Sequence, residues 1–216
     1  MKTTKTCKEY RLDAHNLFET QSNNLVKVFG IYFLISIVLG LTGIGSIVTL
    51  LLSGGFSLSF AYISKKVYNN ETTVVDDLFY GLKDFGKGLA LYLLTFLYSF
   101  LWSLLFIIPG IVKAISYSMA FFIQNDNPDY TASQCIDESK RIMEGHKMDY
   151  FLLTLSYLGW LILSVFTFGI LLLWIMPKMN LAFYLFYLDI TGQPNNSVDC
   201  EDHSDYNEEI HIVYNE

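Results

Sequence analysis

The sequence predicts an all-α, polytopic membrane helical bundle of about six transmembrane helices, arranged as three hairpins with amphipathic connector helices on the cytoplasmic side. Apolar residues make up 52 % of the 216 residues and charged residues 16 %, whereas a soluble domain carries about a quarter charged residues. Three long stretches are almost free of charge: 28–64 has none, 88–125 has only Lys113, and 150–188 has only Lys178. Each stretch is about as long as two membrane spans.

A helix-breaking sequence lies near the middle of each stretch: residues 41–46, Pro109-Gly110 and Phe168-Gly169. Glycine and proline interrupt helices, so each stretch divides into two arms. The predicted hairpins pair 26–42 with 45–65, 88–108 with 110–124, and 150–168 with 170–189. Each arm has roughly 16–19 apolar residues, near the lower limit for a span. A shallow hairpin that enters and leaves the bilayer on one face therefore stays an alternative.

Lysine and arginine concentrate in the segments that alternate with the three breaks, namely 1–27, 65–87 and 140–147. Short loops rich in Lys and Arg remain cytoplasmic, so we expect both termini in the cytoplasm. The chain then divides into a cytoplasmic N-terminal segment (1–25), a membrane domain (26–189) and an acidic disordered tail (190–216). This tail accounts for the formal net charge of −7.

The first connector has apolar residues at helical spacing, which predicts an amphipathic helix. Its apolar face comprises Val75, Leu78, Phe79, Leu82 and Phe85. We expect this face to lie along the membrane surface, or alternatively to pack beneath the bundle.

The second connector predicts a helix over 131–144, capped by Thr131 or Asp129. Gly54 and Gly55 in the first hairpin suit close helix packing.

Two lysines lie within the apolar stretches, where ionisable residues are often functional. Lys178 lies near the middle of its arm, follows Pro177, and has no acidic residue within the predicted spans to pair with. Lys113 lies one turn beyond Pro109 and Gly110, so it can extend to the outer surface. We expect these five residues either to have structural roles or to face a ligand, such as a lipid phosphate in a water-filled groove.

The sequence contains no recognisable catalytic motif, so we expect no enzyme and no cofactor. The three cysteines, Cys7, Cys135 and Cys200, have no metal-binding spacing. Nucleic-acid binding is not expected either, because no basic patch occurs outside the connectors.

Several segments together resemble a bacterial integral membrane family, domain of unknown function 975. The resemblance lies in 77–87, 101–119, 125–128, 132–141 and 145–147, and extends over about 160 residues to Asp189. It implies a multi-pass protein of the bacterial cytoplasmic membrane. It implies no activity and no catalytic residue.

We therefore expect a non-enzymatic accessory or scaffold protein that handles lipid or peptide at the cell envelope. Its expected partners are the lipid bilayer and other membrane proteins or a second copy of the chain. The alternative is a small-solute transporter or channel subunit. This alternative is suggested by a weak parallel repeat, in which Gly86 and Tyr98 align with Gly145 and Tyr157.

Overall fold

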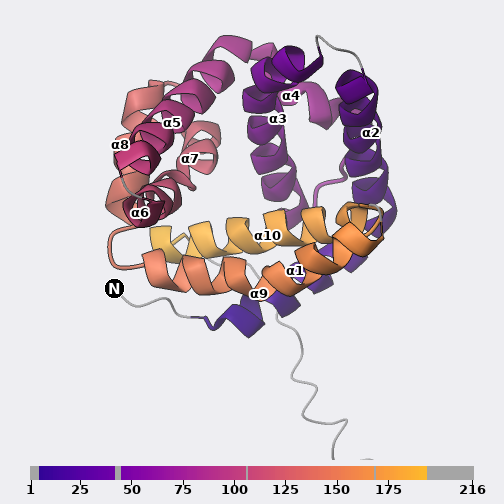
Figure 1. Ribbon diagram of the computed structural model, residues 1–216. Coiled ribbons are helices and arrows are strands. Elements are labelled where there is room, and N and C mark those ends of the chain that lie inside the picture. Colours follow the sequence, from indigo (N-terminus) through magenta and orange to yellow (C-terminus); the bar gives the residue numbers. More distant parts are fainter. Residues whose placement is uncertain (1–4, 42–44, 106, 168, 194–216) are drawn as a thin grey trace, which may run out of the picture.

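The computed structural model describes residues 5–41, 45–105, 107–167 and 169–193, which form helices and turns with no strand among them (Figure 1). The helices are α1 (Cys7–Thr20), α2 (Ser22–Leu41), α3 (Gly45–Tyr68), the 3-10 helix η1 (Val75–Phe79), α4 (Tyr80–Lys83), α5 (Phe85–Leu105), α6 (Ile107–Tyr117), α7 (Ala120–Asp126), α8 (Ala132–Ile142), α9 (Lys147–Phe166) and α10 (Leu172–Thr191). The all-α prediction is confirmed for this part of the chain. The expected disordered tail from residue 194 onward, Cys200 included, lies outside the described residues.

Each predicted hairpin corresponds to two consecutive helices that contact each other: α2 with α3, α5 with α6, and α9 with α10. The third turn contains Gly169, whose φ of +81° is a conformation that L side chains rarely adopt. This glycine therefore explains why the third hairpin turns where the sequence predicted. Residues 42–44 of the first break and Phe168 of the third lie outside the described residues.

The second hairpin turns earlier than predicted. Pro109 and Gly110 are not the turn; α6 begins at Ile107 and contains both of them in its first turn. Proline is tolerated there because the first amides of a helix have no acceptor within the helix. A Cβ on Gly110 would lie 2.7 Å from Ser103 Cα of α5. The Pro-Gly pair therefore allows α6 to pack closely against α5.

Three helical segments among the described residues, not six, are long and apolar enough to cross a membrane: Ser22–Gly40, Phe85–Leu104 and Lys147–Val165. The return arm of the second hairpin is too short, because it is divided into α6 with 11 residues and α7 with 7, whereas a span needs about 20. The return arm of the third hairpin is α10, which carries Pro177, Lys178 and Asp189. The prediction of six spans is therefore wrong for the described residues.

The first connector does not form the single amphipathic helix that the spacing predicted. Residues 75–85 form η1, the four-residue α4 and the start of α5, with a non-helical break at Asp84 (φ −105°, ψ 47°). Contacts with α3 explain the division: the Gly81 amide donates to Ser59 Oγ over 2.9 Å, and Lys66 forms an ion pair of 2.9 Å with Asp77. Tertiary contacts thus determine the connector's backbone.

The second connector forms α8 as predicted. Its Thr131 cap is confirmed, because the Thr131 side chain accepts a hydrogen bond from the Gln134 amide. Ser139 Oγ in turn donates to the Ser116 carbonyl over 2.8 Å, which attaches α8 to α6.

Helix α10 contacts four other helices, α1, α2, α3 and α9. Its C-terminal half is buried from Leu181 to Leu188, except for the partly buried Phe183. The N-terminal segment, expected as a separate cytoplasmic region, contains α1, which packs along α10. Tyr10 donates a hydrogen bond to Asp189 at one end, and Phe18 packs against Trp174 at the other, with ring centroids 6.0 Å apart.

Candidate functional site

A cavity of about 620 Å³ lies between α1, α9 and α10, three helices that pack against one another in Figure 1. Basic side chains and apolar or aromatic side chains both contribute to its walls. The lining residues are Lys8, Arg11, Leu12, His15, Tyr157, Trp160, Leu171, Trp174, Ile175 and Lys178. The cavity volume is in the range that small-molecule sites in proteins commonly have.

The basic wall is formed mainly by one face of α1. Lys8, Arg11 and His15 are spaced three and four residues apart, which places them on the same side of a helix. The adjoining side of α1, with Tyr10, Ala14, Leu17 and Phe18, is buried in the core. Burial of this apolar side against α10 therefore places the basic side at the edge of that contact, where the cavity lies.

Lys178 joins this wall from α10. Its Nζ lies 3.0 Å from His15 Nδ1, 3.8 Å from Glu19 Oε1 and 4.7 Å from the centroid of the Phe18 ring. An ammonium group only donates hydrogen bonds, so His15 Nδ1 is the acceptor in this contact. Lys178 thus has a carboxylate partner that lies outside the predicted spans, because α1 supplies it.

The apolar wall combines α9 and the start of α10. The Arg11 guanidinium lies 5.4 Å from the centroid of the Tyr157 ring, which supports Arg11 from the α9 side. Trp160 and Trp174 are about half exposed, at 46 % and 50 %. Trp174 and Lys178 are one helical turn apart on α10, so aromatic and basic side chains lie next to each other around the cavity.

The five residues predicted as ligand-facing occupy two separate places. Lys178 lines the cavity, and Pro177 is buried beside it in α10. Pro109, Gly110 and Lys113 all belong to α6, where Lys113 Nζ lies 4.8 Å from the centroid of the Trp102 ring of α5. None of these three residues lines the cavity.

The predicted membrane-surface face is also divided. Val75, Phe79 and Phe85 are exposed, whereas Leu78 is fully buried and Leu82 is partly buried against Gly55. Only the first three can contact a membrane surface.

Sequence reasoning found Lys178 but missed Lys8, Arg11, His15 and Tyr157. The spacing of the three basic residues was a signal that the N-terminal segment has a basic face. Nothing in the sequence showed that α9 and α10 would lie beside that face.

Residues 104–194 match the family profile described as Protein of unknown function (DUF975). The match supports the resemblance to this family for that segment of the chain. The match contains the segments 125–128, 132–141 and 145–147, on which the resemblance partly rests, but not 77–87. No curated protein and no solved structure matches the chain.

The DUF975 segment supplies α9 and α10, and with them the aromatic wall and Lys178. Helix α1, with Lys8, Arg11 and His15, lies outside the matched residues. The cavity is therefore formed where an N-terminal helix packs on the DUF975 segment. The family description names no activity, so what this site does must be argued from its own side chains.

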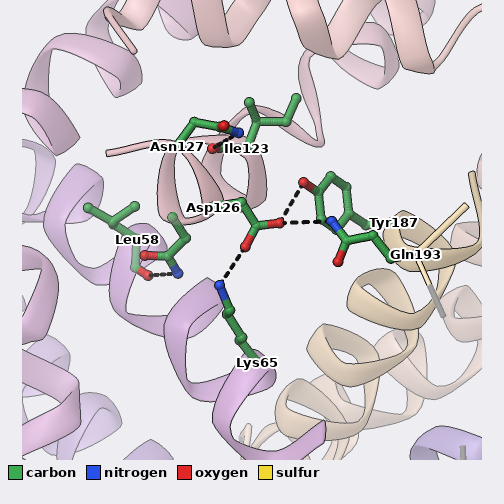
Figure 2. Close-up of polar contacts among 8 residues, drawn as sticks. Leu58, Lys65, Ile123, Asp126, Asn127, Tyr187 and Gln193 are labelled. Atoms are coloured by element: carbon green, nitrogen blue, oxygen red, sulfur yellow. Dashed lines mark hydrogen bonds and ion pairs between the residues drawn. The ribbon is translucent and has the colours of Figure 1, made fainter. Parts of the chain in front are cut away.

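A second polar cluster attaches the DUF975 segment to α3 (Figure 2). Asp126 of α7 accepts hydrogen bonds from Lys65 Nζ and the Tyr187 hydroxyl, both over 2.8 Å, and from Gln193 Nε2 over 3.4 Å. The carboxylate side chain is only 14 % exposed. These contacts pair the negative charge of Asp126 and occupy its carboxylate oxygens. We therefore assign to the cluster the role of holding α3, α7 and α10 together.

In the part of the chain that the structure describes, no group of three or more His, Cys, Asp or Glu side chains is placed to hold a metal ion. The Cys135 thiol is buried and contacts Gln124 Oε1. Burial raises the pKa of this thiol to about 11, which disfavours the reactive thiolate at neutral pH.

Proposed function

We propose that this chain is a non-enzymatic integral membrane protein, and that the cavity between α1, α9 and α10 binds the anionic head group of a membrane lipid. The observation that carries the proposal is the convergence of Lys8, Arg11 and Lys178 on one cavity whose other wall is apolar. An anionic amphiphile has a charged head group and an apolar chain. The basic residues of the cavity match the head group, and its apolar and aromatic residues match the chain.

The charge of the cavity supports an anionic ligand. Its lining includes Lys8, Arg11, Lys178 and His15, and no acidic residue. Glu19 reaches Lys178 from outside this lining, and its side chain is 56 % exposed. Basic groups in a partly enclosed site attract anions more strongly than the same groups in open water.

The aromatic wall supports a lipid in preference to a soluble anion. Trp160 belongs to α9, whose segment Lys147–Val165 is long and apolar enough to cross a membrane and is only 17 % buried within the protein. The exposed side of α9 is apolar and includes Phe151, Leu155, Leu158 and Ile162. These four residues share a face of α9 that points away from Trp160, so α9 presents an apolar surface suited to hydrocarbon on one side and lines the cavity with Trp160 and Tyr157 on another.

The charges of helix α1 indicate that polar surroundings reach the cavity. This helix is polar and includes Lys8, Glu9, Arg11, Asp13 and Glu19, and it extends along α10 from Asp189 to Trp174. These charges need water or head groups around them. We therefore propose that water or lipid head groups reach α1 and the cavity beside it, where Tyr157 and Trp160 lie near the middle of α9. The bacterial cytoplasmic membrane and the cytoplasmic termini stay predictions.

Lipid copurification tests the proposal directly. The full-length protein is extracted in mild detergent, washed, and its bound lipids are quantified by mass spectrometry. We expect anionic lipid at about one molecule per chain, and a loss of most of it in the double variant Lys178→Met, Arg11→Met. Lys140→Met, which removes a lysine of α8 outside the cavity, is the matched control. Equal anionic lipid in the double variant and the control would refute the proposal.

Small-solute transport stays an alternative prediction. Lys178 and Pro109, two of the residues expected to face a ligand, belong to different parts of the fold. Flux across proteoliposomes that Lys178→Met abolishes would favour transport over lipid binding alone.

A further inference from the structure

We infer that the lipid bound in this cavity carries a phosphomonoester head group, so that it is a dianionic lipid such as a phosphatidic acid. This inference rests on the proposed function and specifies its ligand class. The observations that carry it are the net charge of the cavity and the hydrogen-bonding capacity of Arg11 and Lys178.

The charge balance around the cavity favours a dianion. Lys8, Arg11 and Lys178 are three basic side chains, and among the described residues Glu19 is the one carboxylate that lies within 4 Å of their charged groups. An excess of two positive charges remains. A phosphomonoester carries a charge of about −1.5 to −2 near neutral pH, which matches this excess, whereas a phosphodiester carries a single negative charge.

The donors suit the three terminal oxygens of a phosphomonoester. Arg11 offers a planar group of five N–H donors that can bind two phosphate oxygens at once. Its guanidinium lies over the Tyr157 ring, which leaves its edge available for hydrogen bonds. The Lys178 ammonium has three N–H donors, and its contact with Glu19 at 3.8 Å is longer than a hydrogen bond. Lys178 can therefore donate to a phosphate while it keeps its contact with His15.

Zwitterionic lipids fit less well. Their choline or ethanolamine group would add a cation to a cavity that already holds three. A free inorganic phosphate would satisfy the donors but would leave the exposed parts of the Trp160 and Trp174 rings without an apolar ligand. The cavity thus combines two requirements, a dianionic head and an attached hydrocarbon chain.

Binding measurements on the full-length protein in detergent distinguish these ligands. Four probes are titrated separately: dioctanoyl phosphatidic acid, dioctanoyl phosphatidylglycerol, dioctanoyl phosphatidylcholine and inorganic phosphate. We expect the phosphatidic acid to bind about tenfold more tightly than the phosphatidylglycerol, as one further charge-assisted contact would give. We expect phosphatidylcholine and inorganic phosphate to bind at least tenfold more weakly still.

Variants locate the preference in the cavity. Lys178→Met is expected to weaken phosphatidic acid binding about tenfold and to remove most of its advantage over phosphatidylglycerol. Lys8→Gln changes an exposed side chain, so it should fold normally and show the same trend to a smaller extent. Lys140→Met is expected to bind all four probes as the unsubstituted protein does.

The outcomes separate this inference from the proposed function. Equal affinity for the phosphatidic acid and the phosphatidylglycerol, both weakened by Lys178→Met, would overturn the phosphomonoester inference and leave lipid binding intact. Inorganic phosphate that binds as tightly as the phosphatidic acid would overturn the proposed lipid ligand itself. Phosphatidic acid binding that neither Lys178→Met nor Lys8→Gln changes would overturn the assignment to this cavity.

Discussion

The close contact between α3 and α5 can be tested with a single methyl group. A Cβ on Gly54 would lie 2.3 Å from the Gly88 carbonyl oxygen and 2.7 Å from the Gly88 carbonyl carbon. Ordinary carbon–oxygen contacts are about 3.3 Å or longer. The change Gly54→Ala therefore requires the two helices to separate locally by about 1 Å, because the neighbour is backbone and has no rotamer to change.

The expected loss of stability follows from two opposing effects. Overpacking a tightly packed interface costs about 1–3 kcal/mol, and an unyielding backbone neighbour favours the upper half of this range. Removing a glycine from a helix returns about 0.5–1 kcal/mol. The net loss is about 2 kcal/mol, which corresponds to a decrease of about 4–8 °C in Tm for a chain of this length.

Thermal unfolding of the detergent-solubilised protein, followed by tryptophan fluorescence, measures this change. Gly30→Ala in α2 is the matched control, because its Cβ would have no neighbour within 4 Å, and we expect its Tm to stay equal or increase slightly. Gly88→Ala should be intermediate, since its Cβ would lie 3.1 Å from the Gly54 carbonyl oxygen. If Gly54→Ala unfolds at the same temperature as Gly30→Ala, the inferred close contact of α3 and α5 is wrong.

Three further changes test other parts of the fold. Asp126→Ala leaves a lysine and a tyrosine hydroxyl without their shared acceptor, so the free energy of unfolding should decrease by about 2 kcal/mol. The control Asp137→Ala removes an exposed ion pair and should change the free energy of unfolding by less than about 1 kcal/mol. Equal losses in the two variants would contradict the assigned role of the Asp126 cluster. Leu78→Ala should lower the free energy of unfolding by about 2–5 kcal/mol because the Leu78 side chain is fully buried. Phe79→Ser should lower it far less in the same thermal unfolding experiments, because Phe79 is 41 % exposed. The reverse order would show that the connector faces the other way. In a variant that retains only Cys135, the rate of alkylation by iodoacetamide should increase about tenfold per pH unit from pH 8 to pH 10. Burial raises the pKa of the Cys135 thiol to about 11, and only the thiolate reacts. Rapid labelling that does not depend on pH would contradict that burial.

The elements that could be predicted from the sequence are those determined by local chemistry. The third hairpin turns at Gly169, because only a residue that accepts a positive φ suits that turn. Helix α8 begins after Thr131, whose hydroxyl satisfies an amide that the helix itself cannot. The close packing expected at Gly54 and Gly55 is present as well. In each case the decisive interaction lies within a few residues or depends on side-chain size alone.

The elements that could not be predicted depend on partners distant in the sequence. The spacing of Val75, Leu78, Phe79, Leu82 and Phe85 fits one amphipathic helix, but hydrogen bonds and an ion pair with α3 divide the segment. Periodicity shows which residues share a face and does not show which helix that face will meet. Local propensity is a weak determinant once such tertiary contacts form.

Lys178 shows what this limit means for function. Hydropathy placed it alone in the middle of a span, where a charge without a partner costs roughly 2.5–3.5 kcal/mol. The structure instead surrounds it with His15, Phe18 and Glu19 of α1, at 3.0 to 4.7 Å. The Lys178 ammonium therefore does not have to lie unpaired in hydrocarbon. The packing of α1 on α10 both stabilises this lysine and brings Lys8 and Arg11 to the same cavity, so the contact that completes the fold also forms the candidate binding site.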